Sequence, residues 1–295
     1  MLLDIFIPYW GDPALMRETV RSVLAQDSDA WRLTVVDDAY PSDEIERWIG
    51  GLGHPRITYR RKDTNEGITA NYRTCVALAS EPLMMMLGCD DRLLPNYVRA
   101  VLAAHERFPQ AAIIQPGVEV IDEHGAVVST LADSVKRQLA RSRGRGYRLL
   151  GGESLATNLM LGDWLYWPAL TFRTDRIKAF DFREGYPIIQ DLALVMDMIF
   201  AGEQLLLTPD VAFQYRRHSA SASSTKLLDG SRFAGERDYF ALAAAQAAEV
   251  GWSRARRAAR WRLTSRAHAG VLLPRAVARR DAAAVRALAR HVFGA

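Results

Sequence analysis

Apolar residues in the first hundred positions follow two alternating patterns. Short, continuous apolar runs are typical of strands buried on both faces of a parallel sheet, and they alternate with segments whose apolar residues repeat at helical spacing. The expected strands are Leu2–Pro8, Trp31–Asp38, Arg56–Arg60 and Leu83–Gly88, and the expected helices are Pro13–Ala25, Ser42–Ile49, Ile68–Ala79 and Asn96–Phe108. This alternation predicts an α/β fold with a doubly wound, mostly parallel sheet and right-handed crossovers.

The pattern changes after residue 110. Three short strands around an Asp122–Gly125 turn are expected to pair antiparallel: Ile113–Gln115, Glu119–Ile121 and Val127–Thr130. Arg141–Gly152 is rich in Gly and Arg, which predicts a flexible connection that serves either as a lid or as a plain linker. Two further helices are expected over Glu153–Leu161 and Asp191–Ala201, with Gly202 suited to the position after the second one.

Charge is distributed unevenly along the chain. From Gly251 to the end there are eleven Arg and one acidic residue, Asp281, a net charge of +10, so the first 250 residues carry −6 of the overall +4. Basic amphipathic helices with aromatic residues can lie on an anionic membrane surface, although a helical flap with a solvated Arg face is an equal alternative. We place a domain boundary near residue 225, with the α/β domain over 1–225 and an Arg/Ala-rich helical extension over 226–295. The acidic body argues against a nucleic-acid partner.

Several protein classes are disfavoured by composition. No apolar run approaches the roughly 18 residues expected of a membrane span, and Met1–Pro8 lacks the basic start of a signal peptide. Cys75 and Cys89 are the only two cysteines, too few for a disulfide framework or a zinc site. The expected location is therefore cytoplasmic, and peripheral at the inner face of the cell membrane if the tail binds lipid.

The candidate chemistry begins with Gly88-Cys89-Asp90-Asp91, directly after the apolar run Leu83–Leu87. Ligands of open α/β sheets bind at the carboxyl ends of the strands. Two adjacent carboxylates there suit a divalent cation that carries a diphosphate, because Mg²⁺ and Mn²⁺ prefer oxygen ligands. The alternative is a capping turn before a helix opened by Pro95.

Six segments resemble, in order, the motifs of the family 2 glycosyltransferases, which share the nucleotide-sugar-binding GT-A fold. These segments are Ile5–Trp10, Val35–Ala39, Asn65–Gly67 with Asn71, Gly88–Asp91, Gln190–Asp191 and Tyr215–His218 with the serines after it. The resemblance covers roughly residues 2–225. It departs from the family at two positions, because Gly88 stands where many members carry the first Asp of the metal motif and Ala70 where they often carry Arg.

The resemblance implies an inverting enzyme that moves a sugar from a UDP- or dTDP-linked donor to a hydroxyl of a glycan or lipid-linked acceptor. It assigns Asp90 and His218 to a Mn²⁺ or Mg²⁺ ion and Asp191 to the general base. Asp91 is expected to orient either the acidic loop or a metal-bound water. The expected donor contacts are Pro8, Tyr9, Asp37, Asp38, Asn65, Asn71, Cys89, Asp90 and Arg216. Tyr9 would offer a stacking face to the base, Asp37 would accept a hydrogen bond from it, and Arg216 or Arg217 would bind a phosphate oxygen.

Structural alternatives stay open for most of these side chains. Asp191 could cap the helix that follows it, and Asp38 could cap a turn. Asn65 and Asn71 could serve as turn or core residues. Trp164 and Trp167 could form a sugar-binding wall for the acceptor or belong to the core.

Two other functions compete with glycosyl transfer. A sugar nucleotidyltransferase would need a Gly-rich phosphate loop with a cation after the first strand, whereas Tyr9-Trp10-Gly11-Asp12 has one Gly and no cation. A catalytically silent binding subunit of a glycan-assembly complex is suggested by Gly88 and the basic tail.

Overall fold

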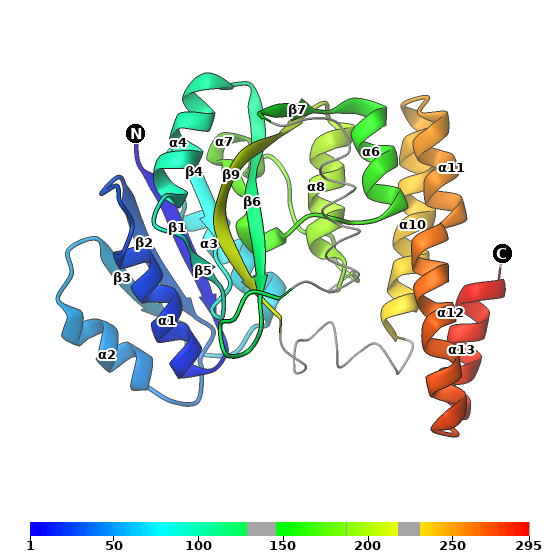
Figure 1. The fold of residues 1–295 in the computed structure, drawn as a ribbon, viewed down its shortest axis with the longest axis horizontal. Helices are drawn as coiled ribbons and strands as arrows, with labels where there is room; N and C mark the ends of the chain where they lie inside the picture. Colours follow the sequence, from blue (N-terminus) through cyan, green and yellow to red (C-terminus); the bar gives the residue numbers. More distant parts are fainter. Residues whose placement is uncertain (129–145, 187, 218–230, 295) are drawn as a thin grey trace.

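The computed structural model of the chain describes residues 1–128, 146–186, 188–217 and 231–294 (Figure 1). A nine-stranded sheet forms its centre, in the order β3-β2-β1-β4-β8-β6-β9-β5 with β7 paired to β9. The strands are β1 (Leu3–Tyr9), β2 (Trp31–Asp37), β3 (Ile57–Arg61), β4 (Leu83–Met86), β5 (Arg92–Leu93), β6 (Ala111–Ile121), β7 (Arg148–Leu150), β8 (Thr171–Arg173) and β9 (Gln204–Arg216). The helices are α1 (Pro13–Leu24), α2 (Glu44–Leu52), α3 (Ile68–Leu78), α4 (Tyr97–Arg107), α6 (Gly152–Leu161), the 3-10 turn η1 (Trp167–Ala169), α7 (Thr174–Ile177), α8 (Gln190–Phe200), α10 (Ser231–Glu249), α11 (Ser253–Trp261), α12 (Leu263–Ala278) and α13 (Ala282–Phe293).

The first half of the sheet confirms the predicted strand–helix alternation. β1 pairs in parallel with both β2 and β4, and β2 pairs in parallel with β3. Every residue of β1 is buried, as expected for a strand covered on both faces. The carboxyl ends of β1, β2 and β4 therefore meet at one edge of the sheet.

The second half is mixed rather than parallel. The two strands expected between Ile113 and Ile121 are one strand, β6, which is parallel to β9 and antiparallel to β8. Its register shifts between Gln115 and Val118, where Pro116 supplies no N–H and Gly117 lies close to the β9 backbone. The expected antiparallel return after the turn is confirmed only as a bridge between Ile121 and Val127. The gap expected between the two predicted strands is therefore a β-bulge within β6.

The connection expected to be flexible is partly sheet. Arg148–Leu150 forms β7, antiparallel to β9, and α6 begins at Gly152, so the prediction is wrong for this stretch. Residues 141–145 lie outside the described residues. The helices predicted over 153–161 and 191–201 are confirmed as α6 and α8, and Gly202 follows α8 with a φ of +95°.

Two layers of helices cover the sheet (Figure 1). Met16 and Val20 of α1 and Val98 of α4 pack on the face of β1 that carries Ile5 and Ile7. The opposite face is covered by α3, α6 and α8, whose buried side chains form one core with α10 and α11.

The C-terminal helices divide into two pairs by their packing. Tyr239 and Phe240 of α10 and Ala255 of α11 are buried in the core that includes α8, as the flap alternative predicts. α12 and α13 pack on each other around a small cluster of their own, which includes Leu272 and Leu288. In the described part of the chain, no helix has both the length and the hydropathy required to cross a bilayer.

Candidate functional site

The acidic loop lies between β4 and β5, at the edge where the parallel strands end. Asp90 and Asp91 are followed by β5, and the next helix, α4, begins only at Tyr97 with Asn96 at its N-cap. The helix-cap alternative for the acidic pair is therefore wrong. The loop is instead held by contacts with α1 and with the end of β9.

Asp91 is a buried carboxylate with a structural role. Its side chain is 1% exposed, and its Oδ1 accepts a hydrogen bond from the backbone N–H of Arg216 at 2.8 Å. Its backbone carbonyl accepts from the Thr19 hydroxyl of α1 at 2.8 Å. Burial and the neighbouring charge of Asp90 raise the pKa of Asp91 well above its usual value, although Arg216 opposes this shift. These contacts fit the expected role of Asp91 in orienting the loop.

The Asp91 carboxylate also accounts for the glycine at position 88. A Cβ on Gly88 would overlap Oδ2 of Asp91 and would lie 3.1 Å from Oδ1 of Asp90. The space that a side chain at 88 would need is therefore occupied by the carboxylate three residues later. The buried carboxylate of Asp91 therefore requires a residue without a side chain at position 88.

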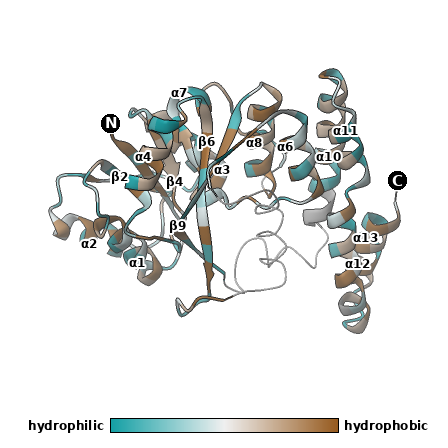
Figure 2. Ribbon diagram, turned by 45° about the horizontal axis from the view of Figure 1, so that its top comes forward, coloured by the Kyte–Doolittle hydropathy of each residue, from teal (hydrophilic) through white to brown (hydrophobic). Residues whose placement is uncertain are grey.

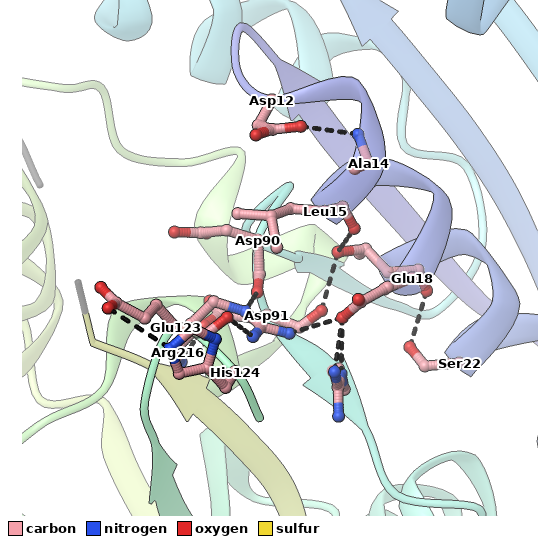
Figure 3. A network of polar contacts seen from close by, with 12 residues as sticks. Asp12, Ala14, Leu15, Glu18, Ser22, Asp90, Asp91, Glu123, His124 and Arg216 are labelled. Atoms are coloured by element: carbon pink, nitrogen blue, oxygen red, sulfur yellow. Dashed lines mark hydrogen bonds and ion pairs between the residues drawn. The ribbon is translucent and has the colours of Figure 1, made fainter. Parts of the chain in front are cut away.

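Arg216 lies at the centre of a polar network that holds this loop (Figure 3). Its Nε donates to the backbone carbonyl of Asp90 at 2.7 Å, and its Nη2 pairs with Glu18 at 2.7 Å. Its Nη1 donates to the carbonyls of Asp122 and Glu123, at 3.2 and 3.0 Å. Because the guanidinium is 1% exposed and engaged within the protein, the prediction that Arg216 binds a phosphate oxygen is wrong. Figure 3 shows the Asp90 side chain directed away from this network, while its carbonyl faces the guanidinium.

Glu18 is a site residue that the sequence did not indicate. It accepts hydrogen bonds from Arg92 as well as Arg216, and so joins α1 to β5 and to the end of β9. Desolvation alone would raise the pKa of Glu18, but hydrogen bonds and charge from the two arginines outweigh it, so the pKa is lowered. A glutamate in an amphipathic helix ordinarily faces solvent, and no local pattern distinguishes this one.

The two acids at the end of β2 shape the neighbouring loops. Asp37 is fully buried, and its oxygens accept from the Tyr40 N–H at 2.7 Å and the Tyr59 hydroxyl at 2.6 Å. Asp38 accepts from the backbone N–H groups of Glu66 and Gly67, at 3.1 and 2.8 Å. The prediction that Asp38 caps the turn after it is wrong, because Asp37 accepts the N–H bond in that turn and Asp38 instead holds the loop before α3. Base recognition by Asp37 stays a prediction, and the structure shows its carboxylate already bonded to two donors.

Tyr9 does not offer the exposed aromatic face that was expected of it. Pro8 and Tyr9 are buried in β1, and the Tyr9 ring packs 5.0 Å from Tyr40, so the prediction that Tyr9 stacks on a base is wrong. Trp10, in contrast, is 49% exposed and meets Tyr40 edge-on at 5.5 Å. Trp10 and Tyr40 are therefore the aromatic side chains that border this end of the sheet. Trp10 directly follows β1 and Tyr40 lies three residues after β2, and this placement at strand ends was the available signal.

Three further residues were predicted to contact the donor, namely Asn65, Asn71 and Cys89. Asn71 is buried, and its Nδ2 donates to the carbonyl of Val36 at 2.9 Å, which confirms the core alternative. Asn65 is exposed on the loop before α3. Cys89 packs against Gly11, and burial raises the pKa of its thiol to about 12. A nucleotide contact by Asn65 or Cys89 stays a prediction.

Asp191 lies in the first turn of α8. The helix begins at Gln190 with Ile189 at the N-cap, so the N-cap alternative for Asp191 is wrong by position. The Thr69 hydroxyl donates to Oε1 of Gln190 at 2.6 Å, and this bond ties the start of α8 to the start of α3. The end of α8 that carries Asp191 is thereby fixed to the α/β body.

Tyr215 links the acidic loop to Asp191. Burial raises the pKa of its hydroxyl to about 12, and the charges of Asp91, Asp90 and Asp191 add to this shift while Arg217 opposes it. One hydroxyl is thus within electrostatic range of all three carboxylates. Asp90 and Asp91 lie against the end of β9, and the charge of Asp191 also acts on the Tyr215 hydroxyl. Exposed Arg217 follows this end of the strand. His218 lies outside the described residues.

The aromatic cluster expected to contact the acceptor belongs to the core. Trp164 and Trp167 are 2% and 8% exposed, and Trp164 Nε1 donates to Asn158 at 2.5 Å. The Trp167 ring packs 5.4 Å from Phe172 of β8. The sugar-wall prediction is therefore wrong for both residues, because tertiary packing buries rings that sequence alone could not place.

The described residues contain no group of three or more His, Cys, Asp or Glu side chains arranged to hold a metal ion. Mg²⁺ is usually bound by one or two carboxylates together with substrate phosphates and water, rather than by an all-protein cage. Asp90 at the end of β4 fits that pattern, whereas Asp91 is turned inward.

The fold and this edge of the sheet agree with the comparisons. A family model described as glycosyl transferase family 2 matches residues 4–153, about half of the chain, so the chain belongs to this family. The match covers β1 to β7 and therefore includes the acidic loop. Family membership favours glycosyl transfer over the nucleotidyltransferase alternative.

Individual relatives are distant. The glycosyl transferase WcaA of Escherichia coli (strain K12), named for colanic acid biosynthesis, is 30% identical over 114 residues, which is 38% of this chain and 41% of that protein. The chain spans less than half the length of the curated relatives it matches.

Two crystal structures of S. aureus TarS 1–349 share the GT-A fold. The complex with UDP-GlcNAc has a TM-score of 0.73 at 12% identity, over 99% of this chain and 82% of that one. The complex with UDP has a TM-score of 0.61 at 12% identity, over 82% of this chain and 65% of that one.

Proposed function

We propose that the chain is an inverting glycosyltransferase that moves a sugar from a UDP- or dTDP-linked donor to a hydroxyl of a glycan or lipid-linked saccharide. The observation that carries the proposal is the acidic loop of a family 2 glycosyltransferase at the carboxyl edge of a GT-A sheet, with Asp191 nearby. A uridine donor is supported by the structural neighbour bound to UDP-GlcNAc. A polysaccharide acceptor is supported by the relative named for colanic acid biosynthesis.

Asp90 is the proposed ligand for Mg²⁺ or Mn²⁺ at the donor diphosphate. A divalent cation bound there would neutralise negative charge on the leaving diphosphate. The network around Arg216 fixes the Asp90 backbone, so the carboxylate projects from a loop that is held in place on its inner side. This arrangement favours a positioned ligand at low entropic cost.

Asp191 is the proposed general base. A carboxylate within hydrogen-bond reach of the acceptor hydroxyl can remove its proton as the oxygen attacks the anomeric carbon. A single base that acts opposite the leaving diphosphate gives inversion. Asp191 lies in the first turn of α8, where the positive end of the helix dipole favours a negative charge.

Isothermal titration with UDP and dTDP, in the presence and absence of Mn²⁺, tests the proposal. We expect metal-dependent binding of at least one nucleotide, and a loss of the metal dependence in Asp90→Asn. Asp210→Asn is the matched control, because Asp210 is an exposed acid on β9. Absence of binding to both nucleotides, or binding that Mn²⁺ leaves unchanged, would overturn the proposal.

A further inference from the structure

The outer surface of the C-terminal helices combines arginine with exposed aromatic residues. On α11 the buried side consists of alanines, whereas Arg256, Arg257 and Arg260 are exposed on the other side. Trp261 ends this helix with 57% of its surface exposed.

α12 carries a continuous apolar stripe on its exposed side. One face of α12, which includes Leu272, packs on α13. A helical repeat of 3.6 residues places a second apolar row on the opposite side. This exposed row, the α12 stripe, consists of Leu263, Ala267, Val271, Pro274 and Ala278. Val271 is 70% exposed, so the stripe is not covered by the described part of this chain.

α13 and the turn before it add cations to the same end of the molecule. Arg279 and Arg280 are exposed in the turn, and Arg286 and Arg290 are exposed on α13. Phe293 is 78% exposed on the side of α13 that carries these two arginines. Figure 2 shows hydrophobic segments on α12 and α13 at the outer end of the molecule, away from the central sheet.

We propose that the outer surface of α11, α12 and α13 binds the surface of an anionic lipid bilayer. This surface combines both components of interfacial binding, apolar side chains that enter the headgroup region and arginines that pair with anionic lipid. A second copy of the chain fits less well, because it would bring two segments of net charge +10 together.

The proposed surface has a consequence for the reaction, and this part of the inference rests on the proposed function. In Figures 1 and 2 the α12–α13 hairpin lies at the end of the molecule opposite α2, beyond the α/β body. Binding through this hairpin would hold the enzyme at the bilayer surface. That position suits an acceptor saccharide held on a lipid carrier.

Co-sedimentation of the full chain with phospholipid vesicles tests the inference. Vesicles of phosphatidylcholine alone are compared with vesicles that contain one quarter phosphatidylglycerol. We expect binding to the anionic vesicles that weakens as salt rises. The triple variant Arg279→Gln, Arg286→Gln and Arg290→Gln should bind about a hundredfold more weakly, since each cation near an anionic surface contributes about fivefold.

The apolar part of the surface is tested separately. The double variant Trp261→Ser and Val271→Ser should bind anionic vesicles at least tenfold more weakly. Val127→Ser and Arg60→Gln are the matched controls, because both residues are exposed on the α/β body and their replacement should leave vesicle binding unchanged.

Three results would overturn the inference: no binding to anionic vesicles, equal binding to both vesicle types, or equal losses in the control variants. Lipid-free self-association that Val271→Asp abolishes would also overturn it and would assign the α12 stripe to a second copy. The outcome is separable from the proposed function, because nucleotide titration of the same variants reports the donor site alone.

Discussion

Gly88 is a position at which one added methyl group should disturb the acidic loop. Alanine there would place a Cβ in the space of the Asp91 carboxylate, which is buried and bonded to the Arg216 N–H. We expect Gly88→Ala to lower the free energy of unfolding by about 1–3 kcal/mol, the usual cost of overpacking. It should also weaken metal-dependent nucleotide binding. Chemical denaturation and isothermal titration measure the two effects.

The control for Gly88 is a glycine with room for a side chain. Gly50 of α2 has no atom within 4 Å of its added Cβ, so Gly50→Ala should leave nucleotide binding unchanged and raise the free energy of unfolding by up to about 1 kcal/mol, because alanine favours the helix. Gly88→Asp restores the residue that many family members carry, yet it should be more damaging than alanine because it brings a third carboxylate beside Asp90 and Asp91. A stable Gly88→Asp variant with tighter metal binding would contradict this account.

Asp191→Asn separates donor binding from chemistry. The amide keeps the size of the side chain but cannot accept a proton, so nucleotide binding should stay within about twofold of the original chain. Hydrolysis of the bound donor, measured as slow release of free sugar, should fall by about 10²–10⁴-fold. Asp210→Asn should hydrolyse the donor at the original rate. Unchanged hydrolysis in Asp191→Asn would remove this residue from the mechanism.

The residue scale shows what a sequence can and cannot predict about this site. Asp90 and Asp191 were assigned from motifs, and the charges of both raise the pKa of Tyr215 at the end of β9. Arg216 and Trp164 occur in or near such motifs as well, but their side chains are buried. Burial of Arg216 depends on Glu18, which lies 198 positions earlier in the chain. No local pattern contains a contact of that separation.

At the scale of elements, Glu18 joins three segments that border the site. It connects α1 to Arg92 of β5 and to Arg216 at the end of β9. Glu18→Gln removes the negative charge that pairs with the buried guanidinium of Arg216. We therefore expect the free energy of unfolding to fall by about 1 kcal/mol at pH 7, a modest loss because Glu18 is partly exposed.

The effect of Glu18→Gln should depend on pH in a defined direction. The folded-state pKa of Glu18 lies below its usual 4.5, so its contribution to stability is present above pH 4.5 and is lost as pH falls through the lowered pKa. The stability difference between the variant and the original chain should therefore shrink in acid. Denaturation at pH 7, 5 and 3 measures it, with exposed Glu249→Gln as the control. A difference that grows in acid would contradict the assignment.

Strands and helices that have a clear apolar pattern in their own sequence were predicted well. Strands whose extent depends on pairing with a strand far away in the sequence were not. The strand–helix alternation from β1 to α4 is confirmed, because burial on both faces gives each strand a continuous apolar run. β6 was expected as two strands, because a bulge at Pro116 and Gly117 interrupts its apolar pattern. β7 was expected as a linker, since its three residues become a strand only through pairing with β9.

At the scale of the whole molecule, the boundary proposed near residue 225 does not coincide with a break in the core. Tyr239 and Phe240 of α10 are buried in the core that contains α8. Asp197 of α8 also bonds to Gln246 of α10 at 2.9 Å and to Arg183 at 2.7 and 2.8 Å. α10 is therefore part of the structure that positions Asp191, whereas α12 and α13 have a separate cluster.

Two truncations distinguish these packing roles. A chain that ends after residue 225 loses both aromatic side chains of α10, each worth about 3–5 kcal/mol, against a typical total stability of 5–15 kcal/mol. We expect it to lose cooperative thermal unfolding by near-ultraviolet circular dichroism, together with nucleotide binding. A chain that ends after Trp261 keeps α10 and α11, so it should unfold cooperatively and bind nucleotide while it loses vesicle binding. If the shorter chain unfolds at the same midpoint as the longer one, α10 contributes nothing to the core that holds Asp191, and the helical extension is an independent unit.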